Sequence, residues 1–226
     1  MNKLKVSLLS LAMAGSMASF SSLATESATV NVKGSITPAA CAINVTGAAD
    51  YGTVTAASVT GKEPVAGGYQ LGQKTVAFNI SCSRETAVAF RPQADAAGEA
   101  GVGVVDNNGT TITNVAALGS LGRTATLVNI GNYYIDYNMP FVDNVAGFII
   151  GSQDGTTWTL TNSAFNQDGS TLYAFRHIMS GANTPEPVTN VSGNIIVSAA
   201  INPTAISELD DVLSFDTNTT LTLEYV

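Results

Sequence analysis

The chain has 226 residues, of which 45% are hydrophobic and 12% are charged, and its 17 acidic residues against 9 basic ones give a formal net charge of −8. Such an acidic chain repels the phosphate backbone of nucleic acids, and the sequence shows no basic patch with interleaved aromatic residues. Nucleic acid is therefore excluded as an expected partner.

Residues 1–24 have the features of a secretory signal peptide. Lys3 and Lys5 form a basic region, an apolar run follows over residues 6–20, and Ser22-Leu23-Ala24 has the small-x-small pattern of a cleavage site. The run is shorter than the ~20 apolar residues that span a membrane, which disfavours a membrane anchor. Cleavage after Ala24 would leave 7 basic residues against 17 acidic ones, a net charge of about −10.

The next segment, residues 25–40, alternates like a β-strand but has no partner nearby in the sequence. Val30, Val32, Gly34 and Ile36 point to one side and the residues between them to the other. The segment begins almost at the expected mature N-terminus, and no hairpin turn joins it to the next strand. Its partner must therefore come from elsewhere.

Cys41 and Cys82 are the two cysteines of the chain. Export to an oxidising compartment makes a disulfide between them the expectation, with two free buried thiols as the alternative. A closed loop of this length, about 40 residues, contributes roughly 4 kcal/mol through loop-closure entropy.

Short alternating runs separated by turn residues recur through the rest of the chain, which is typical of a β-sandwich. Residues 75–82 alternate, and the pattern resumes at Val88 after a polar break at Ser83-Arg84-Glu85. Further strands are predicted over residues 133–142, 148–150, 156–161, 170–178, 193–201 and 219–226. Residues 92–120, rich in Ala and Gly, predict a long irregular segment. Residues 41–226 therefore read as one all-β domain.

Together these features resemble the subunits of bacterial chaperone–usher pili. In that family the N-terminal extension follows the pattern T-V-x-φ-x-G-x-φ-x-x-A-x-C, where φ is apolar, and residues 29–41, TVNVKGSITPAAC, fit it position by position. Cys82 ends an alternating strand, as the family's second cysteine does. Tyr225 is the penultimate residue of a terminal alternating strand, as in the family. The resemblance covers both ends of the chain and the Cys82 strand; residues 92–170 match no motif of it.

The resemblance implies an incomplete immunoglobulin-like β-sandwich that lacks its final strand, with residues 25–40 as a free N-terminal donor strand and residues 41–226 as the pilin-type domain. In the family a periplasmic chaperone first lends a strand to the groove, and the next subunit's extension then replaces it by β-augmentation. The implied function is a structural subunit of a surface pilus (fimbria) that contributes to adhesion. The implied partners are neighbouring subunits, the chaperone and an outer-membrane usher, with export through the periplasm to the cell surface.

The resemblance also implies roles for individual residues. Val30, Val32 and Ile36 would fill pockets of a neighbour's groove, and Gly34 would sit where the groove is shallow. A β-bulge is the alternative role for Gly34. The last strand would form one wall of the groove and the anchor of the chaperone through Leu221, Leu223, Tyr225 and Val226.

A secreted carbohydrate-binding β-sandwich is the alternative function. Trp158 and the tyrosines at 133, 134 and 137 would then stack on sugars, whereas core packing is their other possible role. His177 is the single histidine and no nucleophile elbow is present, so we expect a structural histidine and no enzymatic activity. One histidine and two paired cysteines also cannot supply a zinc site, and we expect no metal or cofactor.

Overall fold

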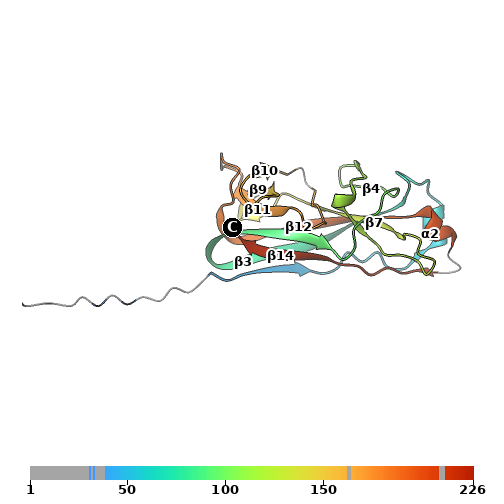
Figure 1. The fold of residues 1–226 in the computed structure, drawn as a ribbon, viewed down its shortest axis with the longest axis horizontal. Helices are drawn as coiled ribbons and strands as arrows, with labels where there is room; N and C mark the ends of the chain where they lie inside the picture. The colour runs from blue at the N-terminus through green and yellow to red at the C-terminus, as the bar shows by residue number, and fades with distance from the viewer. Residues whose placement is uncertain (1–30, 32, 34–38, 162–163, 209–211) are drawn as a thin grey trace, which may run out of the picture. The chain divides into compact units, whose positions relative to one another are not determined.

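The structure is a computed structural model that describes residues 31, 33, 39–161, 164–208 and 212–226. From residue 38 onward the chain forms one compact unit. This unit is built mainly of β-strands, which confirms the all-β expectation (Figure 1). No helix in the described ranges is long and apolar enough to cross a membrane.

The strands are β1 (Cys41–Thr46), β2 (Val54–Thr55), β3 (Tyr69–Ala94), β4 (Val104–Val105), β5 (Thr111–Ile112), β6 (Leu118–Ser120), β7 (Gly131–Tyr137), β8 (Phe141–Val142), β9 (Val145–Ser152), β10 (Thr159–Leu160), β11 (Leu172–His177), β12 (Pro187–Ile201), β13 (Val212–Leu213) and β14 (Thr219–Tyr225). The helical elements are α1 (Ala56–Thr60), α2 (Pro203–Ser207) and the 3-10 helix η1 (Val115–Ala117). The short helices begin at side-chain caps: Thr55 forms a capping box with Ser58, and Asn202 caps α2, which has Pro203 in its first turn.

The 26-residue strand β3 connects two groups of antiparallel strands. Its first half lies between β1 and β12, and β12 continues the first group to β7 and β6. Its second half lies between β14 and β11, and β11 continues the second group to β9 and β10. The short strand β8 pairs with both β12 and β9, so it links the two groups a second time.

One hydrophobic core joins the two groups. Phe78 and Ile80 of β3 contribute from the first group, and Ile149 and Phe175 contribute from the second. Phe90, in the second half of β3, stacks on Phe175 with ring centroids 5.7 Å apart. Alternation along the strands explains this arrangement, because every second side chain of each strand turns inward.

The structure corrects two predicted strand boundaries. The polar break at residues 83–85 does not end a strand: β3 runs through it, and the irregularity appears as a register shift opposite Val188 and Asn190 of β12. The strand predicted over residues 133–142 divides into β7 and β8. Pro140, which has no backbone N–H to donate, lies in the gap between them.

Residues 92–120 are more ordered than the sequence predicts. They contain the end of β3, the β4–β5 hairpin, η1 and β6. Val102, Val104 and Leu118 from this segment are buried in a second, smaller core with Tyr134 and Ala200. These short apolar runs pack against residues that are distant in the sequence, such as Tyr134. They are too short to show the periodic pattern from which a strand is predicted.

The disulfide between Cys41 and Cys82 is present, as predicted. The two cysteines lie directly opposite each other in the β1–β3 ladder. Cys41 is also the first residue of β1, so the bond attaches β1 to β3 at the point where the chain joins the domain.

Asp136 is a buried acid in the middle of β7, with a side chain that is 1% exposed. Burial raises the pKa of its carboxyl to about 6; a hydrogen bond from the Tyr137 N–H at 2.6 Å opposes this shift, and the nearby Asp106 adds to it. The folded state therefore holds the protonated form of Asp136 more tightly than the unfolded chain does.

We predict that replacing both cysteines with alanine lowers the free energy of unfolding by about 4 kcal/mol, because the unfolded chain regains the entropy of an open loop. Urea unfolding of the oxidised protein and of the double variant measures the difference. Equal midpoints for the two proteins would contradict a structural role for the bond.

We predict that Asp136→Asn stabilises the protein in a pH-dependent way. Asn can still accept from the Tyr137 N–H. Because the folded pKa is raised, the carboxyl's contribution is fully present below about pH 4 and is lost as the pH rises through about 6. The variant should match the wild type near pH 4 and exceed it by roughly 1–3 kcal/mol at pH 8. A difference that does not change between these pH values in urea unfolding would contradict this origin.

Candidate functional site

Within the described part of the chain β1 and β14 each leave one edge unpaired, as β6 and β10 do at the other ends of the two groups. β1 pairs with residues 77–82 of β3, and β14 pairs with residues 88–94. The two strands meet at one end, where the backbone N–H of Cys41 donates to the Tyr225 hydroxyl at 3.1 Å. In Figure 1, β14 (red) runs beside β1 (blue). We call the space between these two edges the groove, and its Cys41–Tyr225 end the closed end.

Both edges of the groove present backbone hydrogen-bonding groups. Next to β1, the Ala40 carbonyl accepts from the Ser83 N–H at 2.8 Å, and after β14 the Val226 N–H donates to the Ala87 carbonyl at 3.2 Å. Successive residues of a strand direct their backbone groups to opposite sides, so the alternate residues face away from β3 and into the groove. These residues are Cys41, Ile43 and Val45 of β1 and Thr219, Leu221, Leu223 and Tyr225 of β14.

The inward side chains of the two edge strands are incompletely covered. Ile43, Leu221 and Leu223 pack against the main core but are only partly buried, and Val45 is 46% exposed. Core-facing residues in the neighbouring part of β3, such as Ile80, are fully buried. The edge residues are less buried than those of β3 because each edge strand has a neighbouring strand on one side only. One further strand in the groove would bury these side chains and pair the free backbone groups.

At the end away from Tyr225, which we call the open end, the groove widens into a cavity of about 480 Å³. Its walls come from residues 45–52, after and at the end of β1, and residues 215–221, before and at the start of β14. Its floor is made of core side chains: Val76, Leu121, Tyr133, Ile135, Ile195 and Val197. The cavity therefore offers apolar surface to an inserted side chain.

Two tyrosines hold the cavity in shape. The Tyr51 hydroxyl donates to the Val197 carbonyl at 2.8 Å, and the Tyr133 hydroxyl lies 2.7 Å from the Thr219 hydroxyl. Burial raises the pKa of both tyrosines, so both remain protonated at neutral pH. They act as neutral hydrogen-bonding groups. Tyr133 also packs so closely over Gly119 that a methyl group there would overlap its ring.

The groove contains some of the residues singled out in the sequence. Leu221 and Leu223 line it, and Tyr225 closes one end with a side chain that is 57% exposed. Val226 follows directly and is also exposed. The proposed donor-strand residues Val30, Val32, Gly34 and Ile36 lie outside the described residues.

Apart from Leu221, sequence reasoning missed the residues that form the walls of the cavity. Tyr51 and Phe215 face each other across it with ring centroids 6.3 Å apart, although 164 positions separate them in the chain. Both lie in irregular segments without periodicity. The local signal that could have indicated a turn near Tyr51 is the pair Gly47 and Gly52. Their φ values of 91° and 65° lie in the region that favours glycine.

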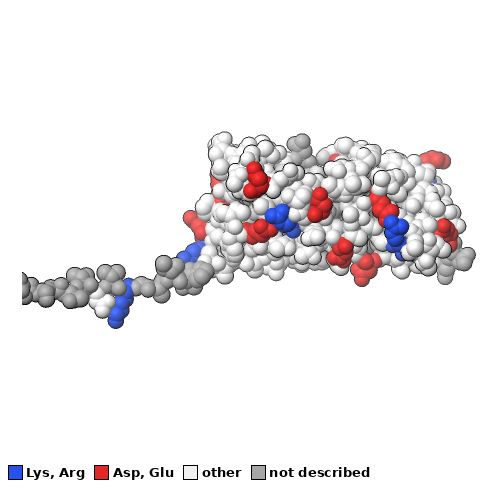
Figure 2. Space-filling view, viewed as in Figure 1, with Lys and Arg blue, Asp and Glu red and all other residues white. Residues whose placement is uncertain are grey.

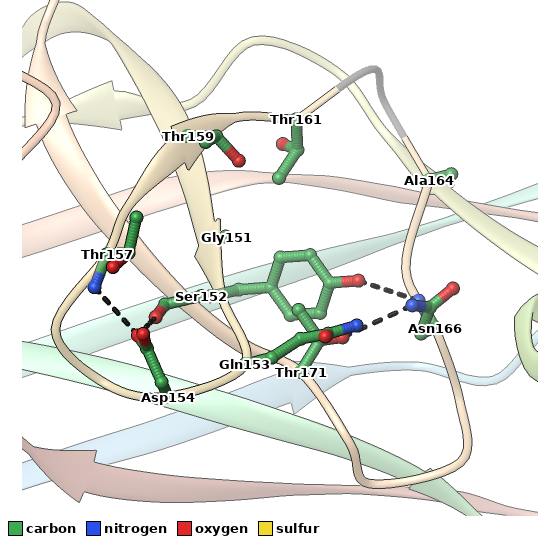
Figure 3. Close-up of a pocket in the computed structure, with 11 residues that line it drawn as sticks. Gly151, Ser152, Gln153, Asp154, Thr157, Thr159, Thr161, Ala164, Asn166 and Thr171 are labelled. Carbon is green, nitrogen blue, oxygen red and sulfur yellow. Dashed lines mark hydrogen bonds between the residues drawn. The ribbon is translucent and has the colours of Figure 1, made fainter.

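A second cavity, of about 600 Å³, lies beside β9 and β10 (Figure 3). Its carboxylate, Asp154, accepts from the Thr157 N–H at 2.7 Å and the Ser152 hydroxyl at 2.9 Å, and these backbone and hydroxyl hydrogen bonds hold its pKa well below the usual range. The Tyr173 hydroxyl accepts from the Asn166 N–H at 2.7 Å. Several of the polar groups that line this cavity thus bond to one another.

The other candidate groups have structural surroundings. His177 places Nδ1 2.6 Å from a carboxylate oxygen of Glu186. No group of three or more His, Cys, Asp or Glu side chains in the described ranges could hold a metal ion. The aromatic residues considered for sugar stacking are all less than 10% exposed and pack inside the domain: Tyr133, Tyr134, Tyr137 and Trp158.

Charged side chains do not concentrate along the visible face of the domain. Figure 2 shows acidic and basic side chains scattered among large uncharged areas. Close to the groove, Arg91 of β3 forms an ion pair with Glu224 of β14 at 2.8 Å. The groove is thus distinguished by apolar surface and free backbone groups rather than by charge.

Comparison with known proteins gives one family match and one relative for part of the chain. Residues 30–134 match a family described as "Protein of unknown function (DUF1120)". Over 154 residues the chain is 30% identical to "Uncharacterized protein YhcF" of Escherichia coli (strain K12), covering 58% of this chain and 64% of that relative. The chain thus spans somewhat less than two thirds of the relative's length. No solved structure matched.

We predict that Tyr225→Phe exposes the closed end of the groove to solvent exchange. The substitution keeps the ring but removes the acceptor of the Cys41 N–H, and a hydrogen bond of this kind contributes about 1 kcal/mol. Exchange of the Cys41 amide, measured by NMR, should quicken roughly fivefold. The Ala42 amide faces β3 and should keep its protection; unchanged exchange at Cys41 would show that the bond is not formed in solution.

Proposed function

We propose that this protein is a structural subunit of a bacterial surface pilus, and that its domain is an immunoglobulin-like sandwich lacking one strand. The groove between β1 and β14 accepts the N-terminal extension of the next subunit. The observation that carries the proposal is the pair of unpaired strand edges on either side of partly exposed core side chains.

An edge of this kind needs a partner. Unpaired N–H and C=O groups beside apolar surface are a template for another strand, and natural proteins cover, shorten or charge such edges. Here the edge residues Ile43, Leu221 and Leu223 are apolar, and β14 has seven residues. A strand supplied by another chain would pair its backbone with the two edges, and its side chains would cover the exposed apolar residues of the core.

The N-terminal extension has the properties of that strand. Residues 30–36 are seven in number, the same as β14, and alternate with Val30, Val32 and Ile36 on one side. Because the core faces only one side of the groove, one apolar side of the inserted strand suffices. Gly34 takes the place of a fourth apolar side chain on this side of the strand, as the extension of the pilus family implies.

The extension serves a neighbouring copy rather than its own domain. The Ala40 carbonyl already bonds to the Ser83 N–H, and the Ala40 N–H donates to the Ser83 hydroxyl at 3.1 Å. The chain therefore joins β1 in line with the β1–β3 ladder, at the closed end of the groove. To fill its own groove, it would have to reverse direction immediately before Cys41.

The proposal defines the other partners and the route. An empty groove would aggregate during export, so a periplasmic chaperone holds it until the next subunit arrives, and an outer-membrane usher passes the growing fibre to the cell surface. Residues 1–24 direct export as a signal peptide. Contribution to adhesion follows from placement in the fibre, and the role requires neither catalysis nor a cofactor. The burial of Trp158 and its companion tyrosines gives the carbohydrate-binding alternative no surface platform.

We predict that moving residues 25–40 from the N-terminus to a position after Val226 stabilises the domain. A short turn-forming linker lets the segment run back antiparallel to β14 and fill the groove of its own chain. Burial of each Val or Ile contributes roughly 1.5–3 kcal/mol, so the rearranged protein should gain several kcal/mol in urea unfolding and remain monomeric.

Two tryptophan variants of the rearranged protein form a matched pair. Gly34→Trp places a large ring against the groove floor and should abolish the gain in stability. Lys33→Trp places the same ring on the solvent side and should retain it. A rearranged protein no more stable than the original, or a gain that Gly34→Trp leaves intact, would overturn the missing-strand proposal.

A further inference from the structure

We propose that consecutive copies of this chain also bind through an apolar contact between opposite ends of the domain. This contact rests on the proposed function and adds to the inserted strand. On one side is the hairpin patch, defined as Met139, Phe141, Val145, Ile178 and Met179. On the other is the far patch, defined as Leu127 and Val212 of the neighbouring copy.

The hairpin patch is a group of exposed apolar side chains on adjacent elements. Phe141 of β8 pairs with Ala146 of β9, and the Ile178 N–H donates to the Ala146 carbonyl at 3.0 Å, so the three residues form a row. Phe141 is 56% exposed and Met179 is 88% exposed. Apolar side chains gathered in this way on a soluble domain indicate a binding surface.

This patch lies at the end of the domain where the N-terminal extension leaves. The Asp143 N–H, in the β8–β9 turn, donates to the Asn190 carbonyl at 2.8 Å. Asn190 pairs with Ser81, the neighbour of the disulfide-bonded Cys82. Figure 1 accordingly shows β9, β11 and the C-terminus at one end of the domain.

The far patch lies at the opposite end. Leu127 is 71% exposed, and its neighbour Thr126 donates from its hydroxyl to Glu208, directly after α2, at 2.5 Å. Val212 is 46% exposed and shortly precedes the segment that forms a wall of the groove cavity. In Figure 1, α2 lies at the end away from the C-terminus, which is the side of the groove's open end.

The geometry of the groove brings these two ends together. The hydrogen bond between Cys41 and Tyr225 closes one end, so an inserted strand connects to its own domain through the open end. From Ile36 to Cys41 the donor chain advances five residue steps, which span at most about 18 Å when extended. The donor's hairpin end must therefore lie against the acceptor's open end. Contact between two different surfaces propagates as an open filament whenever the rotation between successive copies does not close into a ring.

Disulfide trapping in the exported, full-length chain tests this contact. In the double variant Met179→Cys with Leu127→Cys, mild oxidation of assembled protein should produce a ladder of covalent multimers on a denaturing, non-reducing gel. Each single variant carries one new thiol and should give dimers at most. The control pairs Met179→Cys with Val115→Cys, since Val115 is 44% exposed but belongs to neither patch; it should give no ladder.

The two levels of the proposal fail differently. If the rearranged protein gains stability but the double variant yields no ladder, the end-to-end contact is wrong and the inserted strand stands. If the rearranged protein gains nothing, the inserted strand is wrong and the contact falls with it. A second measurement uses Met179→Ser and Phe141→Ser, which should shorten the assembled polymers while leaving the unfolding midpoint of the domain unchanged. Polymers of wild-type length from both variants would also overturn the contact.

Discussion

The free backbone edges of β1 and β14 are the constraint on which the rest of this structure depends. Strands β6 and β10 also pair on one side only, but β1 and β14 hold partly buried core residues beside a groove that nothing described fills. Burial of backbone groups is favourable only when they are hydrogen-bonded, so one further strand in the groove would pair the backbone groups that these two edges leave free. The groove is thus a consequence of β1 and β14 each pairing with β3 on one side only.

The long strand β3 determines where the two edges lie. It carries β1 along its first half and β14 along its second, and the irregular region between the halves lets it serve both groups of strands. Tyr133 then fixes the start of β14 from the first group, through its contact with Thr219. The edges that frame the groove are therefore held by contacts between residues far apart in the chain.

The sequence predicts those parts of the fold that rest on local alternation. The terminal strand, the strand before Cys82 and the run over residues 193–201 all recur in the structure, because their inward residues repeat every second position. The disulfide could be predicted from two cysteines in a chain whose sequence predicts export. The cavity walls could not, since Tyr51 and Phe215 meet only after the strands between them have paired. The ordering of residues 92–120 around Tyr134 escaped prediction for the same reason.

The position of the disulfide has a mechanical consequence. Cys41 is the first residue of β1, and its covalent partner lies within β3, which contacts both groups of strands. Tension applied to the chain ahead of Cys41 therefore passes through a covalent bond directly into β3. The hydrogen bonds between β1 and β3 lie beyond this bond, so they are shielded from the load and cannot be peeled apart one by one. The domain would yield only when β3 itself is pulled from its neighbours, which requires many backbone hydrogen bonds to break together.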